Sequence, residues 1–314
     1  MRSYLQDNGL IKQPDFRDVR FGQLLRAMLL GPKTDLERRA LAEGTDSAGG
    51  YSVPDITLAR FIDLLQAAQV VMRAGAQTVP LTSDRTTIAR TASDPTIAWR
   101  NENAEITPSD MTFEGVILTP RSLACLVVVS RELVEDSLNI ESALEAAFIG
   151  ALSVELDRVA LRGTGTPPQP RGIVNVVGIN EVPATGPFAD YDDLIDAMAA
   201  NWADNSPMTS AIVMSPFNLA ALAKLKEQTT SAYLKKPDVL DGVPMMMTSS
   251  MDDDTAIVGD FSKLIVGIRT SLRIEVLRER YAEFLQFGFL AFLRADVAVE
   301  HPESFCKITN LTTS

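Results

Sequence analysis

Residues 163–172, GTGTPPQPRG, form a glycine-rich stretch and are the first candidates for chemistry. A phosphate-binding loop follows a strand and opens a helix, so that backbone N–H groups and the positive end of the helix dipole face the anion. Here the stretch follows a predicted helix and contains three prolines. Because this order is reversed, the stretch is predicted to end the helix and form a rigid turn.

The acidic run 252–254 supplies oxygen ligands of the kind that divalent cations prefer. A calcium loop spaces its ligands and contains a turn glycine, and the run has neither feature, so we interpret it as a solvated turn. Other carboxylates have a spacing that could pair them for acid–base work, but this spacing is common on exposed helix faces. These are Glu132, Glu135, Asp136, Glu155 and Asp157.

Candidate nucleophiles lack the partners that would activate them. The sequence has no GxSxG motif with a serine that the single histidine, His301, could activate. Cys125 and Cys306 are too few and too far apart for a disulfide framework or a zinc site, and we interpret them as small buried residues. The sequence therefore predicts no catalytic residue, no metal site and no cofactor, and favours a protein that is not an enzyme.

The composition is typical of a folded protein, with 46% hydrophobic and 22% charged residues. A net charge of −12 argues against sequence-specific nucleic-acid binding, which needs a basic footprint. No N-terminal stretch has the order of a signal peptide, and no apolar run reaches the ~18 residues that span a bilayer. We expect a cytosolic product without membrane contact.

Apolar residues spaced three and four apart predict helices at 18–30, 34–44, 56–68 and 140–162. The second helix opens with Thr34 and Glu37, which form a capping box. The last is the longest, with Asn139 as its N-cap and Gly163 after its end. This helix is expected to be the backbone of the fold.

Strand patterns dominate two other regions. Residues 113–130, which end in LACLVVVS, give the strongest strand signal. From about residue 174, short helices and strands alternate, which predicts an α/β part. Its expected helices are 190–201 and 216–227, and its expected strands are 211–214, 243–248, 255–258 and 264–268, with further strands over 272–300.

Residues 82–110 are polar and rich in Thr, Ser and Asp. Two runs of alternating character flank Ser93-Asp94-Pro95, which predicts a long two-stranded hairpin with its turn there. An isolated hairpin is marginally stable in water, so we expect this one to contact a neighbour.

Six segments, in the order of the chain, carry a family resemblance. They are GGYSVP at 49–54, the run 99–113, SRELVEDS at 130–137, the long helix with its exit at 170–173, DGVP at 241–244 and GDF at 259–261. Together they resemble the tailed-phage major capsid proteins of the Hong Kong 97 type, over about residues 45–306.

The resemblance implies an α+β capsid fold with an N-terminal arm, an extended β-hairpin loop, a peripheral domain with a long spine helix, and an α/β axial domain. It would divide the chain into an N-terminal helical segment (1–43), the N-arm (44–54), the extended loop (82–112), the axial domain (174–289) and a peripheral domain (55–81, 113–173 and 290–314).

The resemblance also implies an assembly site on the extended loop, which lies over the adjacent subunit in this family. The candidate residues are Arg85, Arg90, Trp99, Arg100, Glu102 and Glu105. The implied partners are copies of the chain in pentamers, hexamers and a closed shell, with portal, scaffolding and decoration proteins, and packaged DNA touched non-specifically. Such a protein is part of the virion and assembles in the host bacterial cytoplasm.

Two departures from the family pattern matter. Some members seal the shell by joining a lysine of the extended loop to an asparagine of a neighbour. Here no lysine lies between Lys33 and Lys224, no asparagine lies between Asn218 and Asn310, and the matching stretch 284–289 is apolar. The sequence therefore predicts a shell without covalent cross-links.

The second departure is at the N-terminus, where many relatives carry a long helical scaffolding segment that is removed during maturation. About 45 residues precede GGYSVP here. Either a separate protein provides scaffolding, or segment 1–43 does a reduced version of that work.

Two alternatives remain open. An encapsulin-type nanocompartment shell would have the same fold and enclose an enzyme, although the GGY and SRELVEDS motifs favour the phage protein. A cytosolic α/β enzyme using an acidic cluster would instead form a small discrete oligomer.

Overall fold

The computed structural model describes residues 19–43, 51–52, 55–93, 112–137, 139–227, 231–269, 273–277 and 279–312. The chain divides into two units. Unit 1 contains 1–69, 122–156 and 270–294, and unit 2 contains 70–121, 157–269 and 295–314. These units were defined without reference to the predicted peripheral and axial domains, so the bounds of those domains stay a prediction. Within the described ranges, no helix combines the length and apolar character needed to cross a membrane.

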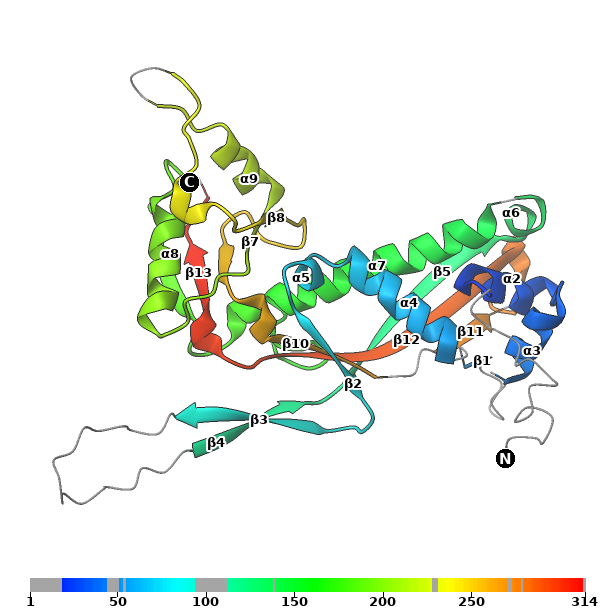
Figure 1. The fold of residues 1–314 in the computed structure, drawn as a ribbon. Helices are drawn as coiled ribbons and strands as arrows, with labels where there is room; N and C mark the ends of the chain where they lie inside the picture. Colours follow the sequence, from blue (N-terminus) through cyan, green and yellow to red (C-terminus); the bar gives the residue numbers. More distant parts are fainter. Residues whose placement is uncertain are drawn as a thin grey trace, which may run out of the picture. The chain divides into compact units, whose positions relative to one another are not determined.

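Unit 1 is built mainly from helices (Figure 1). These are α2 (Phe21–Leu30), α3 (Asp35–Glu43), α4 (Asp55–Ala68), α6 (Arg131–Asp136) and the first part of α7 (Ile140–Arg162). The predicted capping box is confirmed, because the Glu37 N–H donates to Thr34 Oγ1 at 3.2 Å and the Thr34 N–H donates to Glu37 Oε2 at 3.3 Å. The predicted limits of the long helix α7 are also confirmed.

The core of unit 1 joins α2 to α4 and α7. The ring of Phe21 lies 4.4 Å from the ring of Phe61 and 6.0 Å from that of Phe148, between centroids. A Cβ on Gly22 would lie 1.9 Å from the carbonyl oxygen of Glu141, so only glycine allows α2 to approach α7 this closely. The N-terminal helices are therefore part of the core of unit 1.

The strands of unit 1 are part of a six-stranded sheet. They are β1 (Tyr51–Ser52), β5 (Arg121–Ser130), β11 (Arg273–Leu277) and the first part of β12 (Gln286–Val299). Strand β11 runs antiparallel to both β1 and β12, and β5 also pairs with β12.

Unit 2 contains a five-stranded sheet in the order β6-β13-β9-β7-β8 (Figure 1). These strands are β6 (Asn180–Pro183), β7 (Ala211–Met214), β8 (Met245–Met247), β9 (Ala256–Gly259) and β13 (Phe305–Thr309). The central strands β7 and β9 are buried on both faces, because alternate residues enter two separate apolar clusters. Helices α8 (Asp192–Ala203) and α9 (Pro216–Ala223) contribute to one of these clusters.

The remaining elements of unit 2 include a second set of strands. Strand β10 (Leu264–Arg269) pairs in parallel with β2 (Gln77–Leu81) and antiparallel with the last part of β12. Unit 2 also contains the short helix α5 (Val70–Arg73) and the 3₁₀ turns η2 (Ile173–Asn175), η3 (Asp238–Leu240), η4 (Phe261–Lys263) and η6 (Pro302–Ser304), whereas the 3₁₀ turn η5 (Ala282–Phe284) belongs to unit 1.

Three expected elements need correction. The expected strand 113–130 is two strands, β4 (Thr112–Leu118) and β5, because Pro120 between them has no N–H for a strand ladder. The expected helix 216–227 ends at Ala223, since the chain then turns and residues 226 and 233 form a β-bridge. The expected turn at Ser93–Pro95 is wrong, because Ser93 pairs with Thr112.

We predict that Phe21→Ala lowers the free energy of unfolding of the unassembled subunit by about 3–5 kcal/mol, because it empties a ring site between Phe61 and Phe148. Urea unfolding followed by circular dichroism measures this change. Leu30→Ala, on the same helix but 43% exposed, is the control and should cost below about 1.5 kcal/mol. Equal losses in both variants would contradict the buried position of α2.

Candidate assembly site

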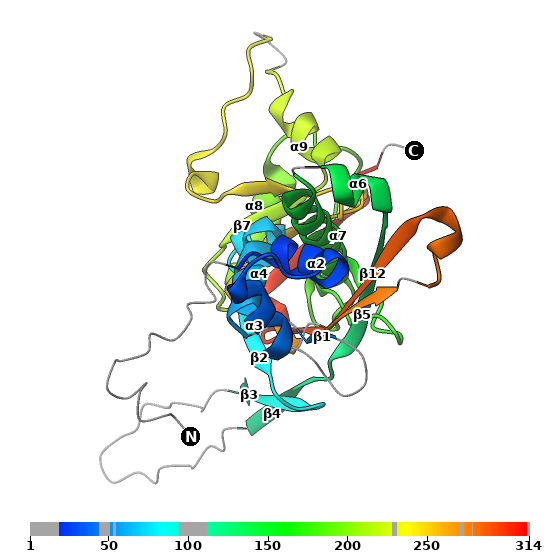
Figure 2. The same cartoon turned by 90° about the vertical axis from the view of Figure 1, so that its right-hand side faces the viewer.

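Strands β3 (Thr86–Ser93) and β4 form an antiparallel hairpin in unit 2 (Figures 1 and 2). One face of the pair is half-buried and contains Ile88 and Val116, which lie opposite each other. The other face is solvent-exposed and contains Ile117. Two strands alone are marginally stable in water, so the direction of the hairpin depends on what its half-buried face contacts.

That face contacts a small apolar cluster shared with the sheet. Leu81, Leu118 and Ile265 are buried together, and Ile88 packs against them. They come from β2, β4, β10 and β3 respectively. A Cβ on Gly267 would lie 2.7 Å from Leu81 Cδ1, so glycine leaves room for this leucine. The base of the hairpin therefore packs into an apolar core.

Arg90 fixes the hairpin by hydrogen bonds. Its Nε and Nη2 both donate to Glu114 Oε2 on the opposite strand, at 3.1 Å and 2.5 Å, and its Nη1 donates to the carbonyl oxygen of Glu300 at 2.8 Å. One guanidinium thus ties β3 to β4 and both strands to the residue that follows β12. Asp84, just before β3, forms an ion pair with Arg269 of β10.

The exit from β4 is held by a buried carboxylate. Asp296 Oδ2 accepts the N–H of Thr119 at 2.6 Å, and the Nη1 of Arg121 donates to the carbonyl oxygen of Gln169 at 2.7 Å. Burial raises the pKa of Asp296, while the backbone N–H donors and the charge of Arg121 act in the opposite direction. Both ends of the hairpin are therefore tied into unit 2.

The structure places two of the six predicted assembly residues. Arg90 is the anchor described above, and Arg85 is exposed, with no side-chain partner within the described ranges. The others, Trp99, Arg100, Glu102 and Glu105, lie outside the described residues. Sequence reasoning missed Asp296 and Glu300, whose contacts with the hairpin span 177 and 210 positions and leave no local signal.

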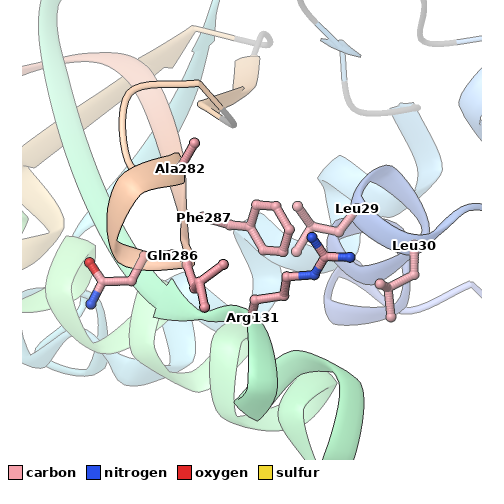
Figure 3. A pocket seen from close by; sticks show the side chains of 7 residues that line it. Leu29, Leu30, Arg131, Ala282, Gln286 and Phe287 are labelled. Atoms are coloured by element: carbon pink, nitrogen blue, oxygen red, sulfur yellow. The ribbon is translucent and has the colours of Figure 1, made fainter.

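Unit 1 contains a separate apolar pocket of about 350 Å³ (Figure 3). Leu29 and Leu30 line it from the end of α2, and Arg131 lines it from the start of α6. The turn before β12 supplies the other side, through Ala282, Leu285, Gln286 and Phe287. The lining offers neither a nucleophile nor a general base, so its chemistry suits packing against an apolar group.

The glycine-rich stretch forms the predicted turn after α7. Thr164 and Arg171 make a β-bridge, and the N–H of Gly172 donates to the carbonyl oxygen of Gly163 at 2.9 Å. A Cβ on Gly163 would lie 2.3 Å from the carbonyl oxygen of Pro170. The turn is confirmed, and its glycines serve close backbone approach.

The acidic run is the exposed turn that was expected, since the Asp252 side chain is 60% exposed and Asp253 is exposed. Asp252 forms an ion pair with Arg162, and Asp254 Oδ1 accepts the hydroxyl of Thr312 at 2.9 Å. These carboxylates hold segments of unit 2 together. Across the residues that the structure describes, no group of three or more His, Cys, Asp or Glu side chains could hold a metal ion.

The other candidate groups are also bound into the fold. Burial raises the pKa of the Cys306 thiol to about 12, and burial also raises the pKa of Cys125. The Nδ1 of His301 lies 3.0 Å from Glu303 Oε1. Neither thiol is activated as a nucleophile by this environment.

Asp157, one of the carboxylates with helical spacing, is buried on α7. Its oxygens accept the N–H groups of Val70 and Val71 at 2.8 Å and 3.2 Å, which caps the first turn of α5. Burial raises the pKa of Asp157 to about 6, against the opposing effect of the two N–H donors. The carboxylate has a structural role in unit 2.

The sequence model of the phage capsid family matches residues 49–310. The major capsid protein of Klebsiella oxytoca phage phiKO2 is 28% identical over 127 residues, which are 40% of this chain and 30% of that protein. The major capsid protein of Halomonas phage phiHAP-1 is 21% identical over 265 residues, 83% of this chain and 44% of that protein. The chain thus spans less than half the length of these curated relatives.

Solved structures give the same fold. The capsid of the native GTA particle matches with a TM-score of 0.62 and 18% identity, over 77% of this chain and 90% of that chain. A chain of Mycobacterium phage Adephagia matches with a TM-score of 0.63 and 14% identity, over 78% of this chain and 91% of that chain.

The long helix, the projecting hairpin and the five-stranded α/β sheet together define a capsid fold of the Hong Kong 97 type, which confirms the predicted α+β class. The chain belongs to the phage capsid family.

We predict that Arg90→Ala speeds hydrogen exchange of the β3 and β4 amides by about tenfold or more, because it removes hydrogen bonds to a carboxylate and to a carbonyl oxygen. Hydrogen exchange read by mass spectrometry on the unassembled subunit measures this. Arg85→Ala changes an exposed arginine of the same hairpin and should leave the exchange as in the parent. Unchanged exchange in Arg90→Ala would show that the apolar cluster holds the hairpin alone.

We predict that the stability of the unassembled subunit falls as the pH rises from about 4 to 6, in part through Asp157. Its pKa of about 6 in the folded state exceeds the ordinary aspartate pKa of 3.8, so the folded state binds more protons than the unfolded state in this window. Between pH 4 and pH 6, Asp157→Asn should lose about 2 kcal/mol less stability than the parent does, measured by urea unfolding at several pH values. Asp63→Asn, at an exposed position, is the control for the loss of one carboxylate; a pH dependence in Asp157→Asn identical to that of the parent would contradict the assignment.

Proposed function

We propose that this chain is the major capsid protein of a tailed phage, which assembles with copies of itself into an icosahedral shell around double-stranded DNA. The observation that carries the proposal is the family match over residues 49–310, which includes nearly all of unit 2 and the part of unit 1 that follows residue 48. The curated relatives named above are major capsid proteins, and the solved relatives have the same fold.

The β3–β4 hairpin is the proposed intersubunit element. Arg90 and the cluster around Leu118 fix its base, while its outer face with Ile117 remains exposed. A fixed base limits the entropy lost when the hairpin contacts another copy. The segment between the strands contains Trp99, an aromatic residue of the kind that dominates interface energetics.

The proposed partners are copies of the chain in pentamers and hexamers, with portal, scaffolding and decoration proteins in the same particle. The acidic chain would touch the packaged DNA only non-specifically. The protein would be part of the virion and assemble in the host bacterial cytoplasm. We propose a structural role without catalysis, in keeping with the family.

The helices before the N-arm are proposed to remain in the mature particle. Phe21 is buried against Phe61 and Phe148, so removal of α2 would expose a large apolar surface. A segment that is discarded on maturation would be expected to have weaker contacts with the subunit core. This proposal favours a separate scaffolding protein over scaffolding by segment 1–43.

Electron microscopy of the purified or co-expressed chain tests the proposed function. We expect rings or closed megadalton particles, which contain DNA when produced during infection. A small discrete oligomer would contradict the proposal and favour a cytosolic α/β enzyme. Particles that enclose an enzyme and no DNA would favour an encapsulin-type shell.

We also predict that mature particles dissolve to single subunits on a denaturing gel with SDS and reductant. No lysine occurs between Lys33 and Lys224, so the extended loop has no amine for the known cross-link. A ladder of resistant multimers would contradict a non-covalent shell while leaving the capsid assignment intact.

A further inference from the structure

The α/β part of unit 2 separates its charges along the sequence. Between Arg171 and Lys224 there is no basic residue, whereas six acidic residues occur there. The next thirteen residues, 224–236, contain four of the eight lysines in the chain. Soluble proteins usually intersperse acidic and basic residues over their surface, so this separation within one folded unit is unusual.

The acidic side is a patch around the start of α8, formed by Asp190, Asp192, Asp193 and Asp196. None of the four has an ion-pair partner in the described part of the chain. Burial and then the charges of the other three raise the pKa of Asp193. The helix dipole favours the first-turn carboxylates, but Asp196 lies beyond that turn, so the dipole does not explain the whole patch.

The basic side is a loop that leads from α9 to β8, formed by residues 224–227 and 231–236 and called here the lysine loop. A backbone hydrogen bond joins its two described parts, since the N–H of Leu234 donates to the carbonyl oxygen of Leu225 at 2.9 Å. Lys226 Nζ lies 5.3 Å from the centroid of the Tyr233 ring, and the Lys235 side chain is 88% exposed. In Figures 1 and 2 the chain after α9 extends away from the five-stranded sheet.

The two charged features are connected to different strands of the five-stranded sheet. Helix α8 contacts β6, β13 and the middle strand β9. The lysine loop leads through η3 to β8, which is the edge strand on the other side of β9 and β7. A subunit that carries opposite charges on two different surfaces fits head-to-tail association, in which these two surfaces of successive copies meet.

The basic side also exposes large apolar side chains. Phe217 on α9, Tyr233 in the lysine loop and Met247 on β8 are 61%, 70% and 59% exposed. Exposed aromatic and methionine side chains beside cations are typical of protein interfaces. This composition favours a protein partner. A surface that binds nucleic acid non-specifically needs cations but no exposed apolar side chains.

We propose that the lysine loop of one copy docks against the acidic patch of the next copy, so that opposite charges set the direction of the ring. This inference rests on the proposed shell function and names the surfaces by which copies of unit 2 meet. Lys226 and Lys235 are the loop residues that would face Asp192 and Asp196, which lie four residues apart on α8.

A charge swap tests the contact. One variant carries Lys226→Glu and Lys235→Glu, a second carries Asp192→Lys and Asp196→Lys, and a third carries all four changes. We expect each pair alone to raise the concentration needed for assembly by about tenfold or more, and the four-change variant to assemble as the parent does. Light scattering and electron microscopy measure assembly, and circular dichroism shows that each subunit is folded.

Mixing the two paired variants sharpens the test. Each contact in the mixture is attractive only between unlike copies, so an alternating ring closes with six members and fails with five. We expect hexameric rings from the mixture and no pentamers. Asp253→Lys reverses an exposed charge of unit 2 outside the patch and should assemble as the parent does.

The contact is overturned if either paired variant assembles like the parent, or if the four-change variant does not recover. Normal assembly of the lysine variant with a loss of DNA binding would assign the loop to nucleic acid. In these outcomes the parent chain still forms particles, whereas a parent that forms none contradicts the proposed function itself.

Discussion

The structure depends on how the β3–β4 hairpin is held. Two strands that bury one face have little stability of their own, so their direction is set by contacts at the base. Arg90 joins the two strands to each other through Glu114 and joins both to the end of β12 through the carbonyl oxygen of Glu300. The apolar cluster that contains Leu118 and Leu81 buries additional apolar surface at the base of the hairpin.

The rest of unit 2 provides a rigid base for this anchor. Strands β7 and β9 are covered on both faces, and Asp157, Asp252 and Asp296 each tie distant segments together. These buried or paired carboxylates therefore have structural roles, in which they cap a helix or join segments that are distant in the sequence. We propose a different role for surface charge, since the acidic patch on α8 and the lysine loop before β8 give unit 2 two unlike surfaces.

Sequence patterns predicted the elements that local signals define. The limits of α7, the capping box of Thr34 and Glu37, and the strand β7 follow from periodicity and from cap residues. The partner of β3 could not be predicted in this way, because an Asp-Pro dipeptide indicates a turn while the burial of Leu118 depends on β2 and β10. Arg90 could be predicted as a charged residue of the hairpin, but its contact with Glu300 could not, because this contact also depends on the tertiary structure.

Cryo-electron microscopy of assembled particles, at a resolution that traces each chain, tests the central claim most directly. We predict that the hairpin extends from its own subunit beyond the Arg90 anchor and that residues between β3 and β4 contact an adjacent copy. A hairpin that folds back onto its own subunit, with no contact to a neighbour, would contradict it.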